Sequence, residues 1–138
     1  MMEEPLNLVL FSGTDDKLQA ASVLAAGAAA LGRPVNVFLQ YWALDAFRKE
    51  RIGHDHGLAP EAGTEGRAHV DALRAAGQAS WADTLRQAKD LGGIDIEACS
   101  LSMDLLGIDE TDLDPLVDGV EGVTAFYLNA GEGQVVFI

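Results

Sequence analysis

The chain contains a single cysteine, Cys99, in 138 residues. One cysteine cannot form a disulfide within the chain, so the sequence gives no sign of an oxidising compartment. Long apolar runs are also absent, because the longest run of small apolar residues, 23–31, is about half of what a bilayer span requires. Residues 1–5 are acidic where a signal peptide would be basic. We therefore expect a cytoplasmic protein with no membrane partner, folded as one domain over residues 1–138.

Basic residues are scarce, and their distribution is uneven. The formal net charge is −13, and residues 94–138 hold ten acidic side chains and no Lys or Arg. Nucleic-acid binding requires clustered Lys and Arg, so we expect no nucleic-acid partner. The common explanation of such a segment is an acidic surface that keeps the protein in solution. The alternative is a docking face around Cys99 for a basic partner.

The usual signatures of cofactor and metal sites are missing. The sequence has no G-x-G-x-x-G fingerprint and no Walker loop, so no nucleotide cofactor is expected. His54, His56 and His69 lie in a glycine-rich excursion, residues 52–79, and could begin a zinc site. No further ligand is evident, and histidines in such loops are usually solvated, so we expect no metal. No histidine is placed to pair with Cys99, and no second cysteine exists, which leaves only single-thiol chemistry.

The sequence does contain a regular alternation of strand and helix patterns. Strand patterns cover residues 6–11, 35–39, 94–98, 117–120 and 134–138. Helical patterns cover residues 15–31, 41–51, 67–76, 81–91, 100–106 and 122–130. The first strand, helix and second strand form a βαβ unit, so the two strands should be parallel with a right-handed crossover. The alternation predicts an α/β, three-layer domain around a mostly parallel sheet of about five strands.

Cys99 lies where a strand pattern ends and a short helical pattern begins. Ser100 is a good N-cap for this helix, and Gly107 is a good residue to end it. The thiol would then lie near the free N–H groups of the first helical turn, which favour a thiolate or another anionic sulfur species. The alternative is an inert buried side chain, which is the commoner state of a lone cysteine.

Three loops should meet at the carboxyl edge of the sheet, where ligands collect in parallel sheets. They are residues 12–14, 40–42 and 99–100. The loop that starts at Ser12 could hold an anion, or it could be an ordinary turn before a helix. Tyr41 and Trp42 could wall a pocket beside Cys99, or they could belong to the core. The candidate catalytic residue is Cys99, and the candidate pocket residues are Ser12, Gly13, Thr14, Tyr41, Trp42, Ser100 and Met103.

Three segments of the chain carry a family resemblance. They are the turn LFSGTDDK at 10–17, the strand VFLQYWAL at 37–44, and the cysteine segment ACSLSMDLLGI at 98–108. These segments resemble the DsrE/DsrF-like sulfurtransferase superfamily, most closely the branch often labelled "peroxiredoxin family protein". That branch has a Trp-Gly-Leu sequence where this chain has Ala43 in place of the glycine. The cysteine segment is the most specific part of the match, and residues 48–93 match weakly.

The resemblance implies a flavodoxin-like α/β fold, assembly as a trimer or hexamer, and a cysteine that carries sulfane sulfur as a persulfide. Only Cys99 matches the sulfur-carrying position. The leading hypothesis is a sulfur-relay protein that passes sulfur from Cys99 to a partner thiol. The expected partner is a small sulfur-carrier or sulfurtransferase protein with a basic surface. The alternative is a non-catalytic oligomeric module that binds a small ligand and has an inert Cys99.

Overall fold

The computed structural model describes residues 4–138, so the acidic start of the chain at residues 1–3 lies outside it. Its five strands form one sheet in the order β4-β3-β2-β1-β5, and all neighbouring pairs are parallel. The strands are β1 (Leu6–Leu10), β2 (Val35–Leu39), β3 (Ile94–Cys99), β4 (Gly119–Glu121) and β5 (Val135–Phe137). The predicted parallel α/β sheet is confirmed.

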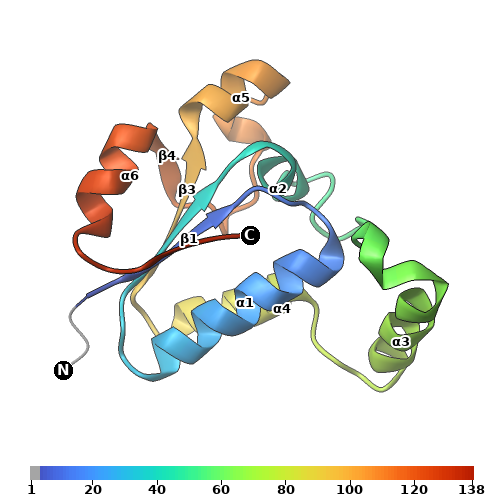
Figure 1. Cartoon of the computed structure of the whole chain (residues 1–138). Coiled ribbons are helices and arrows are strands. Elements are labelled where there is room, and N and C mark those ends of the chain that lie inside the picture. The colour runs from blue at the N-terminus through green and yellow to red at the C-terminus, as the bar shows by residue number, and fades with distance from the viewer. Residues whose placement is uncertain (1–3) are drawn as a thin grey trace.

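Helices cover both faces of this sheet (Figure 1). Helices α1 (Asp15–Ala30) and α4 (Trp81–Asp90) lie side by side on one face, here called the α1 face. Helix α6 (Val123–Ala130) covers the opposite face, here called the α6 face. The remaining helices are α2 (Tyr41–Ala46), α3 (Gly63–Ala75) and α5 (Ser100–Leu106), with short 3-10 turns at Pro60–Ala62 and Glu110–Asp112. Among the described residues, no helix combines the length and the apolar character that crossing a membrane requires.

The larger part of the core lies on the α1 face. Leu8, Val37 and Ile96 form a row across three neighbouring strands and are almost completely buried. Helix α1 meets this row with small side chains, among them Ala21 and Ala25. Alanine buries less area than leucine, but it lets the helix axis lie close to the sheet, so the strands and α1 remain densely packed.

The α6 face has a smaller apolar cluster, made of Val9, Phe38, Cys99 and Phe126. The rings of Phe38 and Phe126 stack with their centroids 4.9 Å apart, which fixes α6 above the centre of the sheet. Helix α6 has only eight residues and leaves apolar side chains of this face in solvent. Those that are about half exposed or more are Val123, Tyr127, Leu128, Val135 and Phe137.

Two predicted helices differ from the structure by more than one residue at an end. The helix expected over 41–51 ends at Ala46, because the backbone beyond it pairs with a distant segment. Arg48 forms a β-bridge with Leu113, and the N–H of Asp114 donates to the carbonyl of Phe47. The helix expected over 67–76 starts earlier, at Gly63, directly after the turn that begins at Pro60. A contact with a distant segment thus ends α2, and the preceding turn sets the start of α3.

Candidate functional site

Cys99 ends β3 at a point where the chain connections change sides. After β3 the chain turns to the α1 face, where Met103 and Ile108 join the larger core. After β4 it turns to the opposite face, where Phe126 of α6 packs in one cluster with Cys99. In a parallel sheet, neighbouring strands whose connections leave on opposite faces create a topological switch point, which is where ligands bind. Cys99 and its register partner Glu121 lie at this switch point.

The sulfur of Cys99 is held at the start of α5. Its Sγ accepts a hydrogen bond from the N–H of Ser102 at 3.5 Å, and the residue is only 4 % exposed. The expected N-cap, Ser100, was wrong by one residue: Cys99 is itself the N-cap, and Ser100 is the first residue of the helix. Extended backbone continues through Cys99 (φ −71°, ψ 117°), so its side chain takes the capping position. An N–H that donates to sulfur stabilises the anionic form.

The turn from β2 into α2 brings Tyr41 and Trp42 to the same edge of the sheet. Tyr41 has a positive φ of 44°, which costs a non-glycine residue about 1 kcal/mol or more. Its ring packs on Phe11 with a centroid distance of 5.1 Å. The turn also places the carbonyl oxygen of Trp42 against Gly13, where a Cβ would overlap it. Glycine is therefore required at position 13 by the close approach of the two loops.

The predicted pocket residues divide between separate places. Ser12, Gly13, Thr14 and Trp42 line a cavity of about 360 Å³, together with Lys17, Asp45, Arg51, His56, Ala59 and Pro60. The other predicted residues do not line it. Ser100 is exposed on α5, Met103 is buried in the larger core, and Cys99 is enclosed on the α6 face. The structure thus brings together the loops that follow β1 and β2, but it does not bring the thiol into their cavity.

A group of carboxylates lies on the sheet face of Cys99, earlier along β3, and sequence reasoning did not identify it as a group. Oxygens of Asp95, Glu97 and Asp118 all lie within 4.8 Å of one another. Asp95 and Glu97 share the sheet face of Cys99, which their spacing along the strand could have indicated. Asp118 could not be placed without the pairing of β3 with β4. Gly119 leaves space for the group, since a Cβ there would lie 2.8 Å from Oε1 of Glu97.

Burial and the repulsion of neighbouring carboxylates raise the pKa of two glutamates here, Glu97 and Glu121. Burial, and then the charge of Asp95, with smaller effects of Glu121 and Asp118, raise the pKa of Glu97 from 4.5 to about 7. Burial and the charge of Asp95 also raise the pKa of Glu121. The negative charge next to Cys99 at neutral pH is therefore smaller than the number of carboxylates suggests.

Glu97→Gln is expected to stabilise the protein at high pH. Folded Glu97 keeps its proton up to about pH 7, whereas the unfolded chain releases it near the ordinary pKa of 4.5, so wild-type stability falls as pH rises through this window. Glutamine mimics the protonated acid, so the variant should exceed the wild type by about 1 kcal/mol at about pH 8 and match it at about pH 5. Urea unfolding at both pH values measures this. Glu132→Gln, at an exposed site, is the control, and an equal difference at both pH values would contradict the prediction.

The same carboxylates are the one group among residues 4–138 close enough to offer three ligands to a single metal ion. One of them is already engaged: Asp118 accepts hydrogen bonds from the Lys89 ammonium at 2.5 Å and from the N–H of Ile96 at 2.8 Å. The three histidines are not brought together as ligands. His54 and His69 are exposed, and the ring of His56 lies 5.9 Å from that of Trp81.

Comparison with known proteins finds a matching family and a similar protein. A sequence model of the DsrE/DsrF/DrsH-like family matches residues 2–61. The chain is 31% identical over 149 residues to the uncharacterized protein YrkE of Bacillus subtilis, covering 93% of this chain and 92% of YrkE.

Two solved structures share the fold. YchN of Escherichia coli is similar with a TM-score of 0.58 and 14% identity, covering 99% of this chain and 100% of YchN. MTH1491 of Methanobacterium thermoautotrophicum, a protein of unknown function, has a TM-score of 0.52 and 16% identity, covering 98% and 99% of the two chains. At these identities the likeness concerns the fold alone.

Proposed function

Because the chain belongs to the DsrE/DsrF/DrsH-like family, we propose that it is a sulfur-relay protein. Cys99 accepts sulfane sulfur as a persulfide and passes it to the thiol of a partner protein. The observation that supports this most directly is the position of Cys99: its Sγ caps α5, accepts the N–H of Ser102, and lies at the switch point of the sheet.

The transfer needs no net oxidation and no cofactor. The Cys99 thiolate attacks the outer sulfur of a donor persulfide, the S–S bond of the donor breaks, and the donor leaves as a thiolate. A new S–S bond then joins that sulfur to Cys99. In the second step an acceptor thiolate attacks the outer sulfur, and the Cys99 thiolate leaves. The N–H of Ser102 can donate to the Cys99 sulfur when it is a nucleophile and when it is a leaving group.

Intact mass after incubation with a sulfane-sulfur donor tests the proposal. The wild-type protein is expected to gain one sulfur, about 32 Da, and to lose it again on addition of a reductant. The gain should be confined to one equivalent, since the chain has one thiol. An unmodified mass at saturating donor would contradict the proposal.

The second candidate function is a small-ligand-binding module with an inert Cys99. The observation that favours it is the burial of Cys99, a residue that is 4 % exposed and lies in a cluster of apolar side chains. Alkylation under native conditions separates the two candidates. A carrier must admit its partner to the sulfur, so Cys99 should react without denaturant, whereas an inert thiol should react only when the protein unfolds.

The acidic third of the chain suggests how the partner approaches. Residues 94–138 carry no Lys or Arg, so a protein that reaches Cys99 meets a negative field. We expect the partner to have basic residues around its own cysteine, and the exchange should slow several-fold between low salt and about 0.5 M salt. Transfer from a neutral small-molecule donor should hardly change. Rates independent of salt in both assays would mean that the acidic residues serve only solubility.

The exposed apolar side chains of the α6 face support assembly into a closed homo-oligomer, and we expect a trimer. Tyr127, Leu128 and Phe137 are each more than 60 % exposed and lie on α6 and on the edge strand β5. Burying them against a second copy would remove this apolar area from water. Light scattering should give a multiple of the chain mass at micromolar concentrations. A monomer mass across that range would contradict this expectation.

A further inference from the structure

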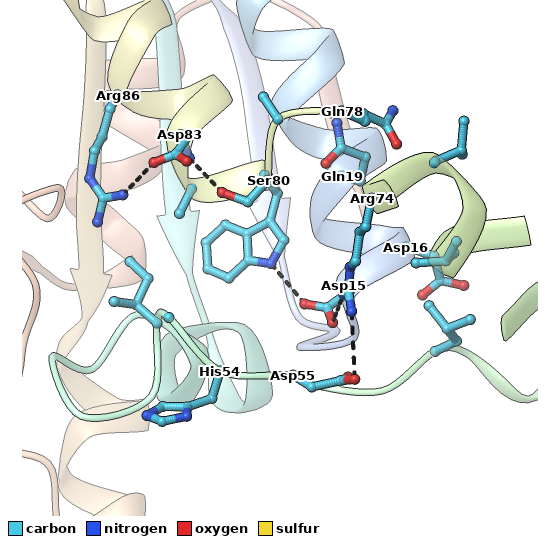
Figure 2. A pocket seen from close by; sticks show the side chains of 18 residues that line it. Asp15, Asp16, Gln19, His54, Asp55, Arg74, Gln78, Ser80, Asp83 and Arg86 are labelled. Carbon is cyan, nitrogen blue, oxygen red and sulfur yellow. Dashed lines mark hydrogen bonds and ion pairs between the residues drawn. The ribbon is translucent and has the colours of Figure 1, made fainter. Parts of the chain in front are cut away.

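A second cavity, of about 630 Å³, lies between α3 and the pair formed by α1 and α4 (Figure 2). Its size is that of sites that enclose small organic molecules. No residue of β3 or α5 lines it, so it is separate from Cys99. In Figure 1, α3 stands to one side of the other helices.

Helix α3 faces this cavity with an apolar side that has little to pack against. Val70, Leu73 and Arg74 follow helical spacing and line the cavity, yet no residue of α3 is buried and Leu73 is 49 % exposed. The wall on the α4 side includes Trp81 and Ala82, which are buried. The apolar side chains on the two sides of the cavity are separated by empty space, so they lack the van der Waals contacts of a packed interior. A ligand with an apolar body would supply these contacts.

Ion pairs, rather than packing, hold α3 in place. Arg74 lies 3.0 Å from Oδ2 of Asp15 and 3.7 Å from Asp55, and Arg67 lies 3.2 Å from Asp55. Asp15 also accepts a hydrogen bond from Nε1 of Trp81 at 2.9 Å, which joins the two walls (Figure 2). The cavity is therefore framed by fixed charges, while its apolar surface stays open to an occupant.

The charges that line the cavity select for a cation. Arg74 and Arg86 are its two guanidinium groups, and both are already paired with carboxylates; Arg86 lies 2.9 Å from Asp83. Asp16, in contrast, has no ion-pair partner in the described part of the chain, although its oxygens accept hydrogen bonds from the backbone N–H groups of Ala59 and Lys17. No Lys, Arg or His among residues 4–138 lies within 4.0 Å of its oxygens. A ligand with a positive group would neutralise Asp16, whereas an anion would find no free cation in the lining.

We propose that this cavity binds a small organic amine, with its apolar body between Leu73 and Trp81 and its ammonium group toward Asp16. The site is independent of the proposed sulfur relay, because it shares no residue with the surroundings of Cys99. It gives the chain a second function, recognition of a cationic small molecule by α1 together with the segment that joins β2 to β3.

Two probes with the same body and opposite charge test the proposal: 3-phenylpropylamine and 3-phenylpropanoate. The chain has two tryptophans, so Trp42→Phe leaves Trp81 as the only one and its fluorescence reports on the cavity. The amine is expected to change this fluorescence saturably and to bind about tenfold or more tightly than the carboxylate. Equal binding of the two probes, or no saturable change up to about 10 mM amine, would overturn the proposal.

Substitutions then locate the ammonium group. Asp16→Asn should weaken amine binding about three- to tenfold, because it removes the unneutralised carboxylate. Asp90→Asn, an exposed change in α4 outside the cavity lining, removes the same charge and should have no effect. Leu73→Gln, also exposed, should weaken binding without touching the core. Equal losses in Asp16→Asn and Asp90→Asn, or unchanged affinity in both Asp16→Asn and Leu73→Gln, would overturn the proposal.

Discussion

Cys99→Ser is expected to lose all sulfur uptake, which is the largest effect foreseen for this protein. A hydroxyl has no accessible anionic form at neutral pH and forms no persulfide, and no other residue of the chain is a thiol. Intact mass after treatment with a sulfane-sulfur donor should therefore stay unchanged in the variant, while the wild type gains one sulfur. Ser100→Ala, which changes the exposed neighbour on α5, should behave as the wild type.

The fold of the variant must be checked beside its mass. Serine can cap α5 as cysteine does, but its hydroxyl would lie in the apolar cluster with Val9, Phe38 and Phe126, at a cost of about 1–2 kcal/mol. Circular dichroism should show a folded protein with a lowered Tm. A folded Cys99→Ser protein that still gains about 32 Da would show that sulfur is bound elsewhere.

Ser102→Pro is expected to slow sulfur uptake about tenfold. Proline has no N–H, so the substitution removes the donor that lies 3.5 Å from Sγ of Cys99. A hydrogen bond to a charged group contributes about 1.5–3 kcal/mol, and the thiolate loses this stabilisation in the variant. Proline is tolerated in the first turn of a helix, where its missing N–H breaks no bond to the preceding turn. The initial rate of persulfide formation at low donor concentration measures the effect.

The matched control is Ser102→Ala, which keeps the backbone N–H and removes only the hydroxyl. Oγ of Ser102 is buried and has no hydrogen-bond partner among residues 4–138, so its loss should leave the rate close to that of the wild type. If Ser102→Ala slows uptake as much as Ser102→Pro does, packing around α5 controls the sulfur rather than the N–H. If neither variant changes the rate, the hydrogen bond has no role in the reaction.

The strands and helices could be predicted because their signals are local. Apolar runs marked β1 and β2, and Gly107 and Gly131 follow the ends of α5 and α6, where the sequence predicted them. The junction of strand and helix at Cys99 was also visible, although the N-cap was displaced by one residue. Cysteine seldom appears among capping residues, so the sequence favoured Ser100 instead.

The parts that could not be predicted depend on contacts between distant segments. The carboxylates of Glu97 and Asp118 meet because β3 pairs with β4, and a three-residue strand such as β4 carries too little pattern to fix that register. The position of α3 depends on Arg74 finding Asp15, which lies 59 residues earlier in the chain. Ser12 follows β1 and Cys99 ends β3 at the same edge of the sheet, and only their three-dimensional surroundings separate the cavity from the thiol.

The enclosure of Cys99 has a kinetic consequence. Cys99 is only 4 % exposed, so its sulfur must become more accessible before it reacts, and this opening slows every small reagent. The rate with such a reagent is therefore the product of the open fraction and the intrinsic reactivity of the sulfur. A partner that binds at the switch point and stabilises the open form is not slowed by the low population of that form. Selectivity between the true acceptor and the abundant thiols of the cell would then come from gating rather than from chemical reactivity.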